Sequence, residues 1–289
     1  MDEELELPQL RDPWMVAAFD GWNDAADAAT GVVDHLIEQW DAELLVELDP
    51  EDFYVFTEHH LRPQVHHVDA HGPEPGGRFI TWPTPRLFVA HPKRSERDVL
   101  LLRAPEPSVR WKSFCAAFLD VAHGVGVTEL YTIGALLADA PHTHPVPVSA
   151  STNDARLAGR LSADPSRYSG PVGITTILTD LAGEQGIATA SIWGAVPHYL
   201  AEPPCPRVTL ALLRALEDAV ELSLPEGVLV ELAEAWQRGA DNAVTDDQEL
   251  AAYVRELESD RETSELPEAS GDAIAREFER YLRHRGEDD

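Results

Sequence analysis

Cysteine is scarce in this chain, since Cys115 and Cys205 are the only two among 289 residues. One possible bridge cannot staple a chain of this length, so we expect two free thiols and a reducing compartment. The sequence also lacks a basic segment followed by an apolar run at its start, and no stretch approaches the roughly 18 apolar residues that span a bilayer. These absences exclude a disulfide scaffold, and they predict a cytoplasmic protein with no membrane partner.

Positive charge is scarce as well. The chain has 22 Lys and Arg residues against 52 Asp and Glu residues, which gives a formal charge of −30. Because a surface this negative repels phosphate backbones, nucleic acid is a poor candidate partner. The hydrophobic fraction of 44% and the charged fraction of 26% are those of an ordinary globular protein, which excludes a wholly disordered chain.

Short apolar runs alternate with helical periodicity over the first 220 residues. Strands are predicted at 14–19, 43–48, 98–103, 128–133 and 188–193, with further short strands in the irregular region at 65–68, 78–82 and 87–90. Helices are predicted after Asn23 and at 110–124, 174–185 and 207–222. This alternation predicts an α/β fold, a mainly parallel sheet flanked by helices in a three-layer arrangement like that of phosphorylases or hydrolases.

After residue 220 the character of the chain changes. Residues 221–289 hold 20 acidic and 7 basic residues, a charge of 7 − 20 = −13. Helical patterns cover 228–238, 247–257 and 272–285. We therefore expect two units, a domain over 8–220 and an acidic helical C-terminal module over 221–289.

Ligands in open α/β sheets bind beyond the carboxyl ends of the strands. That rule selects four loops, at 20–24, 104–107, 134–144 and 194–199. Their polar and aromatic side chains are the candidates for a ligand pocket: Asp20, Trp22, Asn23, Glu106, His142, His144, Trp193, His198 and Tyr199.

Each candidate also has a structural interpretation. Turn and helix-cap chemistry explains the segment 20–24, with Asn23 as the cap of the following helix. His142 and His144 could chelate zinc if Asp139 or His198 converged on them, but no CxxC or HExxH pattern supports this, and histidines that only hydrogen-bond within loops are the default. No serine lies in a G-x-S-x-G motif, and there is no phosphate-binding loop. The sequence therefore predicts no catalytic residue, no metal and no cofactor.

Several motifs together resemble one family. They are Gly170-Pro171-Val172-Gly173-Ile174-Thr175, the stretch from Ser191 to Tyr199 (S-I-W-G-A-V-P-H-Y), the stretch from Phe19 to Ala25 (F-D-G-W-N-D-A), and Pro141-His142-Thr143-His144-Pro145. The chain resembles the PAC2 (proteasome assembly chaperone 2) family, most closely its actinobacterial branch, over about residues 10–220. The resemblance implies a fold similar to the nucleoside-phosphorylase-like group and homo-oligomers, often trimers. It also implies a chaperone role in proteasome assembly for archaeal and eukaryotic members, and it transfers no catalytic residues.

Those members commonly end in a hydrophobic-Tyr-any residue tail that inserts into proteasome pockets, whereas this chain ends Arg285-Gly286-Glu287-Asp288-Asp289. Docking by such a tail is therefore not expected here.

Two functions follow from the sequence. The first is a non-enzymatic, self-assembling scaffold or proteasome-assembly-chaperone-like protein, a homo-oligomer with a trimer favoured, whose partners are proteasome subunits or another protein. The alternative is a small-molecule protein, a nucleoside-like binder or a hydrolase, that uses the strand-end loops.

Overall fold

The computed structural model describes residues 7–58, 61–67, 78–93, 95–161 and 163–263. The predicted helix at 272–285 and the end of the acidic tail lie outside these ranges. None of the helices in the described ranges is both long and apolar enough to cross a lipid bilayer.

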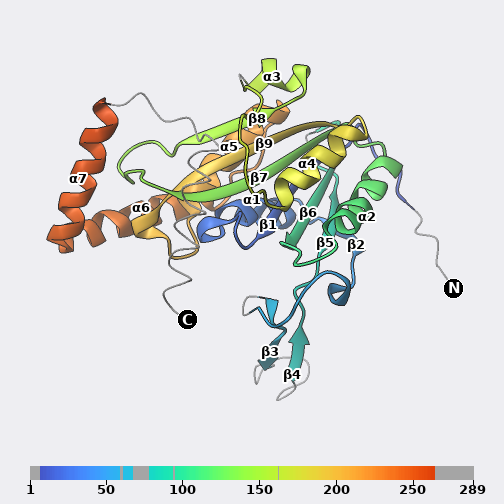
Figure 1. The fold of residues 1–289 in the computed structure, drawn as a ribbon, viewed down its shortest axis with the longest axis horizontal. Coiled ribbons are helices and arrows are strands. Elements are labelled where there is room, and N and C mark those ends of the chain that lie inside the picture. Colours follow the sequence, from blue (N-terminus) through green and yellow to red (C-terminus); the bar gives the residue numbers. More distant parts are fainter. Residues whose placement is uncertain (1–6, 59–60, 68–77, 94, 162, 264–289) are drawn as a thin grey trace.

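A seven-stranded sheet forms the centre of the fold, in the order β2-β5-β6-β1-β7-β9-β8 (Figure 1). Its strands are β1 (Trp14–Asp20), β2 (Glu43–Glu47), β5 (Arg86–Ala90), β6 (Val99–Pro105), β7 (Glu129–Ala138), β8 (Val148–Thr152) and β9 (Ala188–Pro197). The four central strands β6, β1, β7 and β9 are parallel, whereas β5, β2 and β8 pair antiparallel toward the two edges. β2 therefore runs in the same direction as β1 but lies at the sheet edge, because β5 and β6 are inserted between them.

Helices cover both faces of this sheet, so the predicted three-layer α/β fold is confirmed. The helices are α1 (Ala28–Gln39), α2 (Trp111–Gly124), α3 (Ala155–Leu161), α4 (Ile174–Glu184), α5 (Pro206–Val220), α6 (Leu229–Asp246) and α7 (Gln248–Thr263), with short 3-10 turns η1 (Ala25–Asp27), η2 (Pro50–Asp52) and η4 (His198–Leu200). α1 and α5 pack on one face, and α2 and α4 pack on the other.

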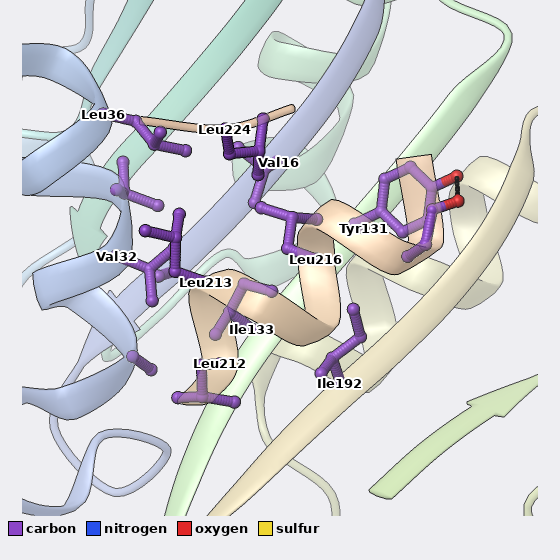
Figure 2. Packing of buried hydrophobic residues seen from close by; sticks show 14 of the residues in the cluster. Val16, Val32, Leu36, Tyr131, Ile133, Ile192, Leu212, Leu213, Leu216 and Leu224 are labelled. Carbon is purple, nitrogen blue, oxygen red and sulfur yellow. Dashed lines mark hydrogen bonds between the residues drawn. The ribbon is translucent and has the colours of Figure 1, made fainter. Parts of the chain in front are cut away.

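Alternation along β1 feeds both layers of the core. Trp14, Val16 and Ala18 point toward α1 and α5, while Met15 and Phe19 point toward α2 and α4. Figure 2 shows the first layer, in which leucines of α5 fill the space between α1 and the strands β1, β7 and β9. Because all of β1 before Asp20 is buried on both faces, its sequence is a continuous apolar run, not an alternating one.

β7 and β9 extend further than the sequence predicts. The predicted strands stop at residues 133 and 193, yet Gly134 and Gly194 lie inside β7 and β9, and the ladder continues to Ala138 and Pro197. A Cβ at Gly134 would enter the ring of Trp193, and one at Gly194 would lie 2.8 Å from Val208 of α5. Glycine at these two positions therefore allows close approach of a neighbour, which is the other reason for glycine within a strand.

A second, two-stranded sheet stands apart from the first. β3 (Gln64–His67) and β4 (Arg78–Thr81) pair antiparallel, and Figure 1 shows them projecting away from the main sheet.

The two cysteines are free, as the sequence predicts, and both are buried. Burial raises the pKa of Cys115 to about 12 and that of Cys205 to about 11. Both thiols are therefore protonated and unreactive at neutral pH.

The C-terminal helices continue the chain from α5. Leu229 and Ala233 of α6 belong to the same buried cluster as α5, so α6 packs onto the α/β unit. α7 follows after Asp247 and contacts α6. The division of the chain at residue 220 stays a prediction.

Candidate functional site

Six of the nine candidate pocket residues fall into three groups at the carboxyl edge of the sheet, and the first two groups are neighbours, because the backbone N–H of Glu106 donates to the carbonyl of Asp20 at 3.0 Å. The first group surrounds Asp20, the second joins Asn23 to Glu106, and the third surrounds His142. The third group lies away from the other two because β7 and β9 run past the end of β1: Ala18 of β1 pairs with Ile133, while β7 continues to Ala138.

Asp20 ends β1 and faces a cleft of about 360 Å³. Its carboxylate lies 2.6 Å from Arg103 of β6, and the same guanidinium lies 3.0 Å from Asp34 of α1. Burial raises the pKa of Asp20 above its ordinary value, and the neighbouring Arg103 opposes that rise. Two carboxylates therefore surround the Arg103 guanidinium, so these three side chains carry a net charge of −1, and Arg86 lines the same cleft.

Apolar walls complete this cleft. Trp82 and Pro83, just after β4, and Phe88 of β5 line it together with Pro105 at the end of β6. Its volume falls within the range of about 300–1,000 Å³ that is usual for small-molecule sites. Trp22, expected here as a wall, is half-buried and is not among the lining residues.

Asn23 and Glu106 form the second group. The Asn23 amide donates to Glu106 Oε1 at 2.9 Å, and the backbone N–H of Ile174 donates to the same oxygen at 2.8 Å. Glu106 thus caps the N-terminus of α4, where a negative charge is favourable. Asn23 is fully buried, and a side chain at Gly173 would collide with it. These two residues join three elements, β1, β6 and α4.

Asp24, not Asn23, caps the following helix, which corrects the sequence prediction. Its Oδ1 accepts from the backbone N–H of Ala29 at 2.7 Å and of Thr30 at 3.2 Å, and the Thr30 hydroxyl donates to its other oxygen. The cap is displaced because Ala26 and Asp27 both adopt positive φ, so α1 begins only at Ala28. Burial raises the pKa of Asp24 to about 7, even though three hydrogen bonds favour its charged form.

His142 and Tyr199 form the third group. The Tyr199 hydroxyl accepts from the backbone N–H of His142 at 2.8 Å and lies 2.8 Å from its Nδ1, while Nε2 lies 3.3 Å from Asp241 of α6. A hydroxyl that accepts one bond has its own proton to donate, which favours the tautomer with hydrogen on Nε2, facing Asp241. Burial lowers the pKa of His142, which keeps the ring neutral at physiological pH.

α7 covers the same loop. Nδ1 of His198 lies 3.2 Å from Asp139, and its ring packs edge-on against Tyr199 and Tyr253. The Thr143 hydroxyl donates to Glu258 of α7 at 2.5 Å. The third group is therefore a junction between the ends of β7 and β9 and the C-terminal helices.

His144 does not join that junction through its ring. Its backbone carbonyl accepts from Arg207 at 2.8 Å, and its Nδ1 contacts only the neighbouring Thr143 hydroxyl among the bonds that the structure describes. The cavity beside His142 and His144, closed by Trp236 of α6, measures only about 10 Å³. A space of that size holds a water at most.

Trp193 lies inside β9, where it pairs with Gly134 of β7 and Ser149 of β8. It covers the bare backbone of Gly134 and does not line a strand-end pocket.

The histidines do not form a metal cluster in the described ranges, where no three His, Cys, Asp or Glu side chains are grouped to hold an ion. His142 and His198 each face a different aspartate, Asp241 and Asp139.

Sequence reasoning missed the partners of the candidate residues. Arg103 and Asp34 surround Asp20, Trp82 walls its cleft, and Asp241 closes the histidine group. One signal was available: Arg103 is the single charged residue in the otherwise apolar strand β6. A cation there needs an anionic neighbour. The positions of Asp34, Trp82 and Asp241 relative to the candidate residues depend on which helices and strands pack together, and the sequence pattern does not show that.

The sequence and the fold match a known family. The PAC2 family model matches residues 18–244, and the chain belongs to the PAC2 family. The prediction of this family and of its actinobacterial branch is confirmed.

Two solved structures from actinobacteria are similar in sequence as well as fold. A PAC2 family protein from Streptomyces avermitilis is 47% identical, with a TM-score of 0.76, over 84% of this chain and 100% of that one. A proteasome-assembly chaperone homologue from Mycobacterium tuberculosis is 41% identical, with a TM-score of 0.74, over 83% of this chain and 99% of that one.

An archaeal proteasome activator from Pyrococcus furiosus, PbaB, has a TM-score of 0.62 at 16% identity, over 83% of this chain and 96% of that one, which shows a shared fold. Among curated protein sequences, none matches this chain.

Proposed function

We propose that this PAC2 family protein is a non-enzymatic, self-assembling scaffold that acts in the cytoplasm and binds proteasome subunits during their assembly. The observation that carries the proposal is the similarity, at 41% identity over nearly the whole of the other chain, to a protein described as a proteasome-assembly chaperone homologue.

The use of the strand-end polar groups supports a binding role over a catalytic one. Glu106 and Asn23 hold α4 against the sheet, and His142 with Tyr199 holds the C-terminal helices. An enzyme of this fold would gather such groups around one open pocket. Here Asn23, Glu106, His142 and Tyr199 join elements, and Asp20 is the candidate that faces an open cleft.

The test is direct binding. The purified chain is mixed separately with proteasome α subunits, β subunits, half-proteasomes and mature 20S particles from a related actinobacterium, and native mass spectrometry measures the complexes. We expect a complex of fixed stoichiometry with at least one assembly intermediate, and faster appearance of mature particles. An unrelated protein of equal size and negative charge is the control, because acidity alone can cause weak association.

If the chain forms no complex with any of the four proteasome species, the proteasome role is contradicted. Metabolite turnover abolished by Asp20→Asn would contradict the non-enzymatic role.

The cleft at Asp20 favours a second candidate function, in which the protein binds a nucleoside-like small molecule or hydrolyses it. Trp82 and Phe88 offer faces on which a base could stack, and Asp20 could accept from sugar hydroxyls. A thermal-shift panel of nucleosides and sugars tests it, with Asp20→Asn as the matched variant. A ligand at about 100 times its Kd stabilises the folded state by about 2.7 kcal/mol. An unchanged midpoint for every compound would exclude this candidate.

A further inference from the structure

The cleft beside Asp20 is lined by elements that lie far apart in the sequence. The segment after β4 contributes Trp82, Pro83 and Thr84, and the ends of β1 and β6 contribute further lining together with α1. Its volume of about 360 Å³ lies near the lower end of the usual range for ligand sites. A cleft of this size favours an occupant as large as one ring or one long side chain.

The charge that an occupant would meet in this cleft is mainly negative. The side chains of Asp20 and Asp34 are 38% and 53% exposed, whereas Arg103, which contacts both, is 25% exposed. The Arg103 guanidinium already lies 2.6 Å from Asp20 and 3.0 Å from Asp34. One partly covered cation is thus shared between two more accessible carboxylates.

Arg86 lines the same cleft, but its charge is balanced by a residue outside the lining. Its Nε lies 2.8 Å from Glu47 of β2. With this pair set aside, Asp20, Asp34 and Arg103 leave a net charge of −1. The chain as a whole carries −30, and such a field raises the concentration of cations near the surface. Electrostatic complementarity therefore calls for a positively charged occupant.

The Asp20 carboxylate is incompletely compensated by its one cation. Burial raises the pKa of Asp20 above its ordinary value although Arg103 opposes that rise. The charged form is therefore less stable in the cleft than in water. A second cation beside Asp20 would offset part of this cost.

The walls of the cleft supply aromatic surface and carbonyl acceptors. Trp82 is 44% exposed, and Phe56 packs edge-on against its ring at a centroid distance of 5.3 Å. Phe88 adds a second ring to the lining, while Pro83 and Pro105 have no backbone N–H to donate. A cation is attracted to an aromatic face, most strongly to that of tryptophan. These walls therefore suit a cation on an apolar stem better than an anion, which needs donors.

We propose that the Asp20 cleft binds an organic cation, a guanidinium or primary ammonium group on an apolar or aromatic stem. The carboxylates of Asp20 and Asp34 accept hydrogen bonds from the cation, and Trp82 and Phe88 pack against its stem. The inference goes beyond the proposed function. It also differs from the nucleoside candidate, because the charge of the ligand is the feature that the cleft recognises.

Three compounds of nearly the same shape and different charge test this inference: benzamidine, which is a cation, benzamide, which is neutral, and benzoate, which is an anion. Ligand-observed NMR titration of the full chain measures the Kd of each, with adenosine as a fourth compound. We expect benzamidine to bind at least about tenfold more tightly than benzamide, and benzoate to bind most weakly. Added sodium chloride should weaken the binding of benzamidine, because it screens the carboxylates.

Variants of the lining locate the site. Asp20→Asn and Asp34→Asn each remove one carboxylate, and each is expected to raise the Kd of benzamidine by about tenfold. Glu38→Gln is the matched control, since it removes an exposed charge from the same helix as Asp34 but outside the cleft, and it should leave this Kd within about twofold. Arg86→Gln removes a cation from the lining, so it should tighten the binding of benzamidine, whereas it would weaken an anion site.

A second pair of probes separates two sources of such a cation. Agmatine represents a free amine, and a capped tripeptide with a central arginine represents a basic side chain of a partner protein. Tighter binding of agmatine assigns the cleft to a small metabolite, and tighter binding of the peptide assigns it to a protein partner. Either result supports the recognition of an organic cation.

Four results would overturn the inference. They are equal binding of benzamidine and benzamide, tighter binding of benzoate, no binding of benzamidine at all, and an unchanged benzamidine Kd in Asp20→Asn and Asp34→Asn chains that circular dichroism shows to be folded. Binding of adenosine without benzamidine would favour the nucleoside candidate in its place. No proteasome subunit is present in these titrations, so their failure is distinct from a failure of the proposed function.

Discussion

The Asp24 carboxyl group is buried away from water and lies beside several hydrogen-bond donors. It is 6% exposed and accepts the backbone N–H groups of Ala29 and Thr30. The cost of burying its charge exceeds the gain from these bonds, which is why its pKa rises to about 7. This balance makes the stability of the fold depend on pH through one residue.

The pH dependence can be tested with Asp24→Asn. The Asp24 carboxyl has an ordinary pKa of 3.8 and a folded-state pKa of about 7. Between these two pH values the unfolded chain has released the Asp24 proton, whereas the folded chain keeps it. Asp24 therefore lowers the free energy of unfolding over that interval, by as much as about 4 kcal/mol. We expect the asparagine variant to lack this decline, as measured by urea denaturation at a series of pH values. Asp27→Asn, one residue before α1, is the control, and parallel profiles for wild type and Asp24→Asn would refute the assignment.

Glu106 tests whether the second group is structural. Glu106→Ala leaves the buried Asn23 amide and the Ile174 N–H without their acceptor. We expect a loss of about 1–3 kcal/mol in the free energy of unfolding, whereas the exposed Glu38→Ala should change it by less than about 0.5 kcal/mol. Chemical denaturation measures both. Unchanged stability in the Glu106 variant would instead favour a ligand-binding role for this carboxylate.

The elements that carry the third group are the long strands β7 and β9 and the helices α6 and α7. Tyr199 follows β9, and its hydroxyl bonds twice to His142, whose other nitrogen faces α6. One phenol therefore links two strand ends to the acidic helices. Removal of the Tyr199 hydroxyl should therefore weaken the attachment of α6 and α7 more than it weakens the packing of the core.

We expect Tyr199→Phe to loosen α6 and α7 while the sheet stays intact. Amide hydrogen exchange read by mass spectrometry should show faster exchange in these helices, with β1 and β6 unchanged, which corresponds to a loss of about 1–3 kcal/mol in the free energy of local opening of α6 and α7. Tyr168→Phe, which removes an exposed hydroxyl bonded to Pro171, is the comparison. Equal exchange in both variants would show that the histidine junction does not hold the helices.

The same elements show how far sequence reasoning reaches. Apolar runs and helical periodicity predict most strands and helices of the α/β unit, because burial on two faces or on one stripe leaves a direct trace in the residue pattern. They miss β8 and α3. The predicted strands at 128–133 and 188–193 end too early, because Gly134 and Gly194 are positions of close approach inside β7 and β9 and do not break them.

Strand order left no comparable trace in the sequence. Arg103 reaches Asp20 because β6 is the neighbour of β1, a pairing between residues that lie far apart in the chain. The Asp20 cleft therefore could be predicted only in part: the position of Asp20 at a strand end follows from sequence, while its partners do not.

At the scale of the whole molecule, a net charge of −30 sets a repulsive background. Exposed carboxylates repel one another more in the compact state than in the expanded chain, and salt screens that repulsion. We expect the midpoint of thermal unfolding to rise by about 2–5 °C between low and moderate sodium chloride. A neutral osmolyte at equal osmolality separates screening from solvent exclusion, and a midpoint that falls with added salt would count against net repulsion.

The buried thiols have a practical consequence for all of these measurements. Since Cys115 and Cys205 are both buried and protonated, alkylating reagents should not react with the native chain. A single cysteine introduced on the β3–β4 hairpin or on α6 would then be the one position that reacts with a fluorophore, a spin label or a crosslinker, and Cys115 and Cys205 would not first have to be replaced.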